Sequence, residues 1–390
     1  MRIGNTIYFD HHATTPVDNR VLAKMLPYFS EAFGNPHSGD HAIGWEATRA
    51  TDAAAEQVGR LIHADADEIV FTSGATEANN LAMLGLSDSA LAQKKRHVLL
   101  SSIDHKSALA VGRVLQKRGF VVTLLPVSPD GHLDLEGLQE SLNGNVLLVS
   151  LSLVNSEIGT IQKLTDIADL LREHGVLLHC DAAQAPCAIE MSEVTSSADL
   201  VSLSAHKMYG PKGIGALFIK RSIQGLFEPI IHGGGQQRNL RSGTLPAPLC
   251  VGFGAAAEIL MQDDAVEERE RIKSRRDLFV TLLRGSGSPI LVNGPEGPGR
   301  HPGNANVRFV GLSGHDLLAA LQPKLAASTG SACSSGIPEP SHVLRGIGLS
   351  AAEAESSIRF CVGRHTSDAD IHEAARLVSN TVSALSSAAA

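Results

Sequence analysis

Short apolar runs alternate with amphipathic stretches through the middle of the chain. The strand-like runs cover residues 68–72, 97–101, 120–125, 146–151, 176–180, 200–204 and 216–219. The helix-like stretches between several of them cover residues 76–92, 107–117, 135–142 and 164–173. Continuous apolar strands that alternate with helices are typical of a mostly parallel sheet that helices cover on both faces. The sequence therefore predicts an α/β fold.

The pattern changes after a Gly- and Pro-rich stretch at residues 233–248. The elements expected beyond it are a long charged helix at 258–283, strands at 304–309 and 358–362, and a final helix near 368–385. The chain has 390 residues, and an ordinary domain has roughly 100–200. We therefore expect a large domain at residues 15–258 and a small α+β domain formed by residues 1–14 and 259–390.

The composition indicates a globular protein without membrane or nucleic-acid partners. Apolar residues make up 43% of the chain, and the formal net charge is −8, which argues against a nucleic-acid surface. No apolar run approaches the roughly 20 residues of a membrane helix. Residues 1–10 show no apolar signal core, and the five cysteines form no CxxC pair. We expect a cytoplasmic protein with neither a disulfide framework nor a metal site.

Three features of the predicted large domain indicate one kind of ligand. Residues 73–76 are small and open a helix after a strand, where backbone N–H groups can bind a phosphate or simply form an ordinary turn. Asp181 follows an apolar strand and could pair with a pyridine nitrogen or cap a helix. Lys207 follows the next strand within a Gly-rich loop, where its amine could bind an aldehyde or lie on the surface. Because Asp181 and Lys207 end consecutive strands, we favour a single pyridoxal-phosphate (PLP) site.

A series of motifs carries a family resemblance. They are DHHATTP at 10–16, GNP at 34–36, TSGATEANN at 72–80, DHK at 104–106, VNSEIG at 154–159, DAAQ at 181–184, SAHKMYGPKG at 204–213, RSGTLP at 241–246, GSACS at 330–334, and residues 357–363. In this order they resemble the cysteine desulfurases of the NifS/IscS-like group, within the class V aminotransferase family and PLP fold type I. The resemblance covers residues 5–380 and implies a mostly parallel, seven-stranded sheet plus a small α+β domain.

The resemblance implies a PLP site in a homodimer. The cofactor-binding residues that it implies are Ala75, Thr76, His105, Asp181, Gln184, Ser204, His206, Lys207 and Thr244. Lys207 would bond the cofactor aldehyde, and Asp181 and Gln184 would bind the ring nitrogen and the phenolic oxygen. His105 would stack on the ring. Thr244 would reach the phosphate bound by the other subunit.

The resemblance also implies the substrate, L-cysteine, and the catalytic residues Lys207, His105 and Cys333. The substrate carboxylate is expected on Arg359, with Asn155 and Asn35 helping to orient it. Cys333 would take the sulfur as a persulfide, leave L-alanine, and pass the sulfur to an acceptor protein.

The surroundings of Cys333 in the sequence agree with this role. Residues 328–336 are small and polar and show neither a strand nor a helix pattern, so they indicate an exposed loop. The other four cysteines lie in apolar or Gly/Ala-rich stretches or after a proline, where a free thiol packs as a small apolar group. A nucleophilic thiol requires exposure, which we expect for Cys333 in this loop.

The acceptor and two rival functions stay open. The sequence ends at Ala390, soon after the last expected helix, where typical iron–sulfur-cluster members carry a longer extension. The acceptor could therefore serve iron–sulfur cluster assembly or the thio-modification of tRNA or DNA. A selenocysteine lyase or an aminotransferase-like enzyme is the first rival, and a degenerate homologue acting as a structural partner is the second. The intact set of site residues argues against the second rival.

Overall fold

The computed structural model describes residues 1–287, 289–330 and 339–389 and contains the predicted seven-stranded sheet. Its strands are β3 (Ile69–Thr72), β4 (His97–Ser101), β5 (Val121–Leu125), β6 (Val146–Ser152), β7 (Leu177–Asp181), β8 (Leu200–Ser204) and β9 (Gly215–Ile219). Their order in space is β3-β9-β8-β7-β6-β4-β5. The pairs β3–β9 and β9–β8 are antiparallel, and the other pairs of this sheet are parallel. The prediction of a mostly parallel sheet is confirmed.

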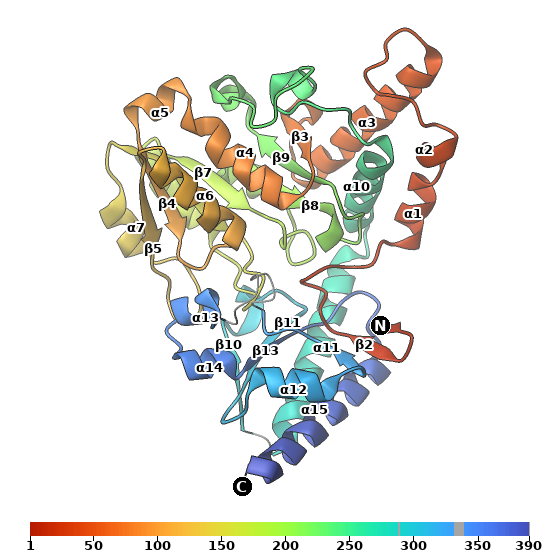
Figure 1. Cartoon of the computed structure of the whole chain (residues 1–390), viewed down its shortest axis with the longest axis vertical. Coiled ribbons are helices and arrows are strands. Elements are labelled where there is room, and N and C mark those ends of the chain that lie inside the picture. The colour runs from red at the N-terminus through yellow and green to blue at the C-terminus, as the bar shows by residue number, and fades with distance from the viewer. Residues whose placement is uncertain (288, 331–338, 390) are drawn as a thin grey trace.

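Helices cover both faces of this sheet, as the apolar character of its strands requires (Figure 1). The helices that pack on one face are α4 (Ala75–Ser87) and α6 (Lys106–Lys117), followed at the margin by α5 (Ala90–Lys94). Those that pack on the other face are α1 (Asn19–Met25), α3 (Ala42–Leu61), α7 (Leu135–Ser141), α8 (Leu164–Glu173), α9 (Val194–Ser197) and α10 (Ala247–Leu260). The short α2 (Pro27–Ser30) follows α1.

Two helix predictions were wrong at their boundaries. The helix expected at 76–92 ends at Ser87, because Ser89 caps a new helix by accepting the N–H of Ala92 at 3.0 Å. The charged helix expected at 258–283 is the second of two helices, α11 (Ala265–Gly285), and its expected first residues close α10. The intervening residues 261–264 turn the chain out of the large sheet's core.

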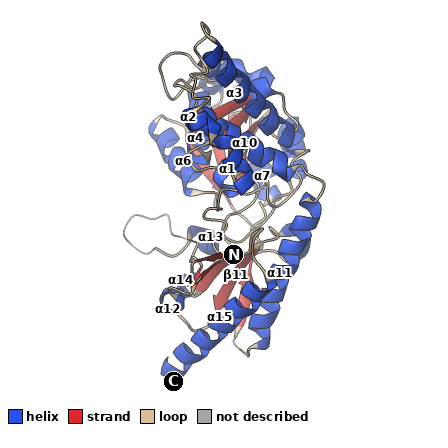
Figure 2. Ribbon diagram, turned by 90° about the vertical axis from the view of Figure 1, so that its right-hand side faces the viewer, coloured by secondary structure: helices blue, strands red, loops and turns tan. Residues whose placement is uncertain are grey.

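A second core lies below the first (Figures 1 and 2). Its antiparallel sheet consists of β10 (Ile290–Asn293), β11 (Asn304–Phe309) and β13 (Ser357–Cys361). The helices around it are α11, α12 (Gly314–Leu321), α13 (His342–Gly346), α14 (Ala351–Glu355) and α15 (Asp368–Ala389). A small sheet of β1 (Arg2–Ile3), β2 (Thr6–Tyr8) and β12 (Leu325–Ala326) brings the N-terminus to this core. The two hydrophobic cores are separate. The predicted domain boundaries stay a prediction.

A buried ion network joins the two parts of the molecule at Arg364. Its guanidinium donates to Asp18, before α1, at 2.9 Å and to Glu268, on α11, at 2.8 Å. It also lies 4.2 Å from the ring centre of Tyr209, whose hydroxyl accepts the backbone N–H of Arg364 at 2.6 Å. The side chains of Arg364 and Asp18 are 7% and 6% exposed, so water screens their attraction weakly.

We expect Arg364→Met to lower the free energy of unfolding in urea by about 3 kcal/mol, because it removes buried charge-assisted hydrogen bonds to both Asp18 and Glu268, although Arg20 still pairs with Asp18. The control is Arg221→Met, which removes an arginine that pairs with Asp65 and Asp67 on the surface. This control should unfold close to the wild-type midpoint. Equal losses in the two variants would contradict a special role for the buried network.

Candidate cofactor and substrate site

The carboxyl ends of the parallel strands open on a cavity of about 550 Å³. Ser152 ends β6, Asp181 ends β7 and Ser204 ends β8, and all three line the cavity. Ligands bind at this edge of open α/β sheets. The second core closes the cavity from the other side with Arg359 of β13 and His342 of α13. The cavity therefore lies between the two parts of the molecule.

Most of the residues predicted for the site meet in this cavity. Those that line it are Ala75, Thr76, His105, Asn155, Asp181, Gln184, Ser204, His206, Lys207 and Arg359. Asn35 and Thr244 are exposed and do not line it. Cys333 lies outside the residues that the structure describes.

One end of the cavity is suited to a phosphate. Helix α4 begins there at Ala75, and its N-cap residue, Gly74, has no side chain with which to satisfy the first N–H groups. A Cβ atom built on Gly74 would meet nothing within 4 Å, so the backbone here borders open space. Uncapped N–H groups and the helix dipole together favour an anion. Beside them His206 contacts the hydroxyl of Thr14 at 3.1 Å, and burial lowers its pKa to about 4.

Asp181 fits a protonated ring nitrogen at the floor of the cavity. Its carboxylate accepts the Asn79 amide at 2.7 Å and the Ala183 N–H at 3.0 Å. It is 7% exposed, and none of the ion pairs in the described part of the chain includes it. A buried carboxylate that has neutral donors can pair with the cation that a protonated pyridine provides.

Lys207 reaches the cavity from a 3-10 turn, Ala205–Lys207, directly after β8. Its Nζ donates to the carbonyls of His12 and Ala13, the latter at 2.8 Å. The Gln184 amide donates to the same His12 carbonyl at 2.8 Å. The N-terminal motif therefore holds both side chains at the cavity wall, where PLP bonding was predicted for Lys207.

Arg359 lines the cavity and has one unsatisfied donor. Its Nη1 donates to the Ser156 carbonyl at 3.0 Å, and its Nη2 donates to Asp10 at 2.7 Å. Its Nε is buried and has no hydrogen-bond partner among the described residues. A buried N–H without an acceptor costs about 1–3 kcal/mol. A substrate carboxylate would supply the missing acceptor.

Asn155 lines the cavity, but its carboxamide is engaged by the protein. Its Oδ1 accepts the N–H groups of Glu157 at 2.9 Å and Ile158 at 3.0 Å, and its Nδ2 donates to the Ile103 carbonyl at 3.1 Å. These bonds shape the turn that presents the Ser156 carbonyl to Arg359. The predicted role of Asn155 in orienting the substrate stays a prediction.

Two buried carboxyl groups were missed as site residues, although their motifs were noted. Burial raises the pKa of Asp104 to about 8. The hydrogen bonds that it accepts from the N–H groups of Ser101 and Ser152 act in the opposite direction and lower that pKa. Burial likewise raises the pKa of Glu157 to about 7. Both line the cavity. The sequence did contain a signal for Asp104, because it follows β4 shortly after that strand ends. Asp181 and Lys207 had been singled out because they too follow strands.

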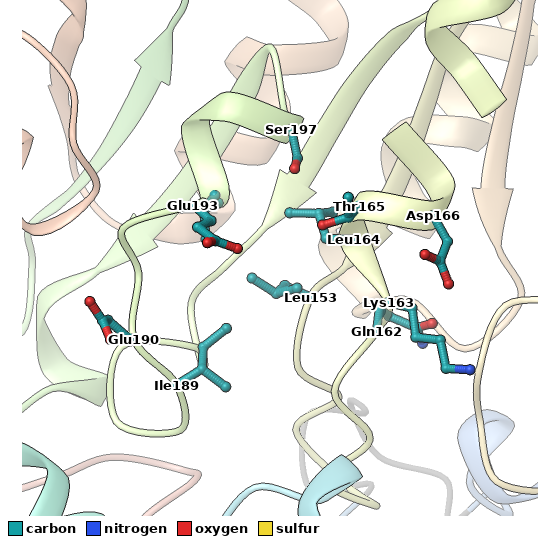
Figure 3. A pocket seen from close by; sticks show the side chains of 11 residues that line it. Leu153, Gln162, Lys163, Leu164, Thr165, Asp166, Ile189, Glu190, Glu193 and Ser197 are labelled. Carbon is teal, nitrogen blue, oxygen red and sulfur yellow. The ribbon is translucent and has the colours of Figure 1, made fainter. Parts of the chain in front are cut away.

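A second cavity of about 510 Å³ lies beside α8 and α9 (Figure 3). Leu153, Leu164, Asp166, Glu190 and Glu193 are among the residues that line it. It contains none of the described residues predicted for the site. Within the described residues, no group of three or more His, Cys, Asp and Glu side chains is placed to hold a metal ion.

Comparisons with known proteins agree with this geometry. The model of the family described as aminotransferase class-V matches residues 7–373. The cysteine desulfurase IscS of Rickettsia rickettsii (strain Iowa) is 42% identical over 379 residues, which cover 97% of this chain and 92% of that protein. The IscS of Rickettsia akari (strain Hartford) is 43% identical with the same coverage.

Solved structures show the same similarity. A NifS-like protein superposes with a TM-score of 0.89 at 31% identity and covers 97% of this chain and 99% of its own. SspA in complex with cysteine gives 0.81 at 36% identity and covers 93% and 100%. DndA from Streptomyces lividans gives 0.75 at 36% identity and covers 93% and 99%. The chain belongs to the class-V aminotransferase family and, within it, to the PLP-dependent cysteine desulfurases.

Proposed function

We propose that the cavity between the two parts binds PLP and L-cysteine, and that Lys207, His105 and Cys333 carry out the desulfuration. The observation that carries the proposal is the meeting of Lys207 and Asp181 with Arg359 in one cavity. An amine and a carboxylate from consecutive strands face a guanidinium from the other core. This set suits an amino acid held against a pyridine aldehyde.

Each residue has a defined task in this proposal. Lys207 would hold PLP through its amine, and the same amine, once replaced by that of cysteine, would take the substrate α-proton. The chemistry supplied by bound PLP is that of an electron sink. Arg359 would fix the substrate carboxylate through its guanidinium, which has one donor to spare. His105 would exchange a proton with the substrate thiol, and its Nδ1 contacts the Ser107 hydroxyl at 2.8 Å.

Cys333 would receive the sulfur. Its thiolate would attack the substrate sulfur, so that an S–S bond forms while the carbon–sulfur bond of the substrate breaks. Protonation of the remaining three-carbon fragment gives L-alanine, and Cys333 is left as a persulfide. The described thiols are poor alternatives, because burial raises the pKa of Cys187, Cys250 and Cys361 to about 12.

The persulfide would pass to an acceptor protein for iron–sulfur cluster assembly or for the thio-modification of tRNA or DNA. Direct nucleic-acid binding is not part of the proposal, because the net charge is −8. Among the described residues, no helix combines the length and apolar character that a bilayer crossing requires. The cytoplasm is the proposed location, because the described cysteines are all free thiols, as is usual in a reducing compartment.

The proposed functional unit is a homodimer. Large apolar side chains are exposed on and around α2 and at the start of α3, at the right of the upper part in Figure 1. They are Leu26, Phe29, Phe33, Ile43 and Trp45, each at least half exposed. An apolar group of this size on a globular protein indicates an interface. Asn35 lies within this stretch. In a dimer, the predicted site residues that do not line the cavity of their own chain could reach the cavity of the second copy.

The activity is tested by measuring alanine and sulfide released from L-cysteine and a reductant. We expect equal amounts of the two products from the wild type and a loss of at least about 100-fold in Cys333→Ala and Lys207→Ala, because each variant lacks a covalent partner of the reaction. Cys333→Ala should keep the yellow colour of bound cofactor. Cys250→Ala, a change in α10 outside the cavity, is the matched control and should stay active. Full activity in Cys333→Ala would refute the sulfur-acceptor role.

The homodimer is tested by sedimentation velocity of the holoenzyme. Phe33→Glu should shift the protein from dimer to monomer, because it places a charge within the apolar interface. Val310→Glu, a change at an exposed site near the end of β11, should leave the dimer intact. A monomeric wild type, or a dimeric Phe33→Glu, would contradict the proposed interface.

A further inference from the structure

His12 contacts the surroundings of both charged side chains that the proposed function assigns to the substrate. It is 3% exposed and lines the cavity together with Lys207 and Arg359. Its backbone carbonyl accepts Nζ of Lys207 and the amide of Gln184. Its imidazole binds the backbone of Ser156, which Arg359 also binds. One buried residue therefore connects the amine of the site with the guanidinium.

The carbonyl of Ser156 is shared by His12 and Arg359. Nδ1 of the His12 ring lies 3.0 Å from this oxygen, and Nη1 of Arg359 donates to it at 3.0 Å. A carbonyl oxygen has two lone pairs, so two donors use its whole capacity. Arg359 also donates to Asp10 through Nη2. The guanidinium is thus held by a carboxylate and by a carbonyl that the imidazole binds as well.

The contact with a carbonyl fixes which nitrogen of His12 carries the proton. Burial lowers the pKa of His12 well below its ordinary value, so the ring is neutral at neutral pH and carries one proton. A carbonyl oxygen accepts and cannot donate, so that proton lies on Nδ1. The amide of Asn304 lies 3.5 Å from the same nitrogen, but it donates to the Glu157 carbonyl at 3.0 Å. The Nδ1–H group of His12 is therefore a donor to Ser156.

The other nitrogen of the ring shows that an imidazole is costly at this position. Nε2 of His12 is buried and has no hydrogen-bond partner among the described residues. A buried acceptor without a donor lowers stability. The ring packs edge-to-face on His301, with 4.2 Å between the ring centres, and an apolar ring could make the same contact without that cost. What an apolar ring could not supply is the donor to Ser156.

We infer that His12 is a positioning residue for substrate recognition: its imidazole fixes the Ser156 carbonyl and thereby the guanidinium of Arg359. The inference rests on the proposed function, in which Arg359 binds the substrate carboxylate. It predicts that loss of the Nδ1–H donor weakens the binding of ligands through their carboxylate. The binding of simple amines at the cofactor should be spared, because it does not require the guanidinium.

The experiment compares two ligands of the holoenzyme, L-alanine and ethylamine, which is alanine without its carboxylate. The change in cofactor absorbance at increasing ligand concentration gives the affinity for each ligand without sulfur transfer. In His12→Ala the affinity for L-alanine should fall at least about tenfold, because small displacements of a positioned group have effects of this size. The affinity for ethylamine should stay close to that of the wild type.

Two further substitutions test which nitrogen matters. In His12→Asn the amide nitrogen takes the place of Nδ1 and can donate to Ser156, so most of the affinity for L-alanine should return. In His12→Gln the amide lies one atom farther out, near the position of Nε2, so the loss should resemble that of His12→Ala. The matched control is His174→Ala, because the Nδ1 of His174 also contacts a backbone carbonyl, that of Leu170 at 3.0 Å, but on an exposed residue outside the cavity. This control should bind both ligands as the wild type does.

The outcomes separate this inference from the function beneath it. If the wild type binds L-alanine no better than ethylamine, the proposed role of Arg359 fails and the inference fails with it. If the wild type prefers L-alanine and His12→Ala keeps that preference, the inference alone is refuted. It is also refuted if both affinities fall together, or if His12→Gln restores the binding of L-alanine and His12→Asn does not. If His12→Ala does not fold, the comparison of His12→Asn with His12→Gln decides by the same criterion.

Discussion

The register of β7 against β8 is the constraint on which the site depends. The parallel pairing places Asp181 beside Ser202, so the last residues of the two strands reach the same edge of the sheet. Lys207 follows one turn beyond β8. A slip of one residue would turn Asp181 to the opposite face of the sheet. The acid and the amine are therefore placed by backbone hydrogen bonds between strands that are buried almost throughout.

Burial explains why the large sheet could be predicted from the sequence. Its central strands are apolar on both faces, so each produces a continuous run that stands out from the helices around it. The small sheet gives a weaker signal, and β10, which is partly exposed, was not predicted. Helix α3 was also missed, because alanine and threonine rather than large apolar residues fill much of its buried face. The break after Ser87 depends on a single capping serine.

The site was predictable where motifs placed residues at strand ends, and less so where contacts join distant parts of the chain. Asp10 and Arg359 lie 349 positions apart, and local patterns do not indicate that they pair. The bonds of Asn155 within its own turn, to Glu157, Ile158 and Ile103, were likewise not indicated by the motif. The burial of Asp104 and Glu157 follows from the closure of one core over the other, and a sequence read element by element does not contain that information.

Arg359 shows how the two cores can act as one site. A lone guanidinium in this position would be costly to bury, and Asp10 and the Ser156 carbonyl offset part of that cost. They leave Nε without an acceptor. A carboxylate bound there would complete the arginine's hydrogen bonds and at the same time connect β13 to the edge of the large sheet. The energy gained would depend on the charge and planarity of the ligand's carboxylate, which an amine or a thiol cannot reproduce. Under the proposed function, this unsatisfied donor would favour a ligand that carries a carboxylate.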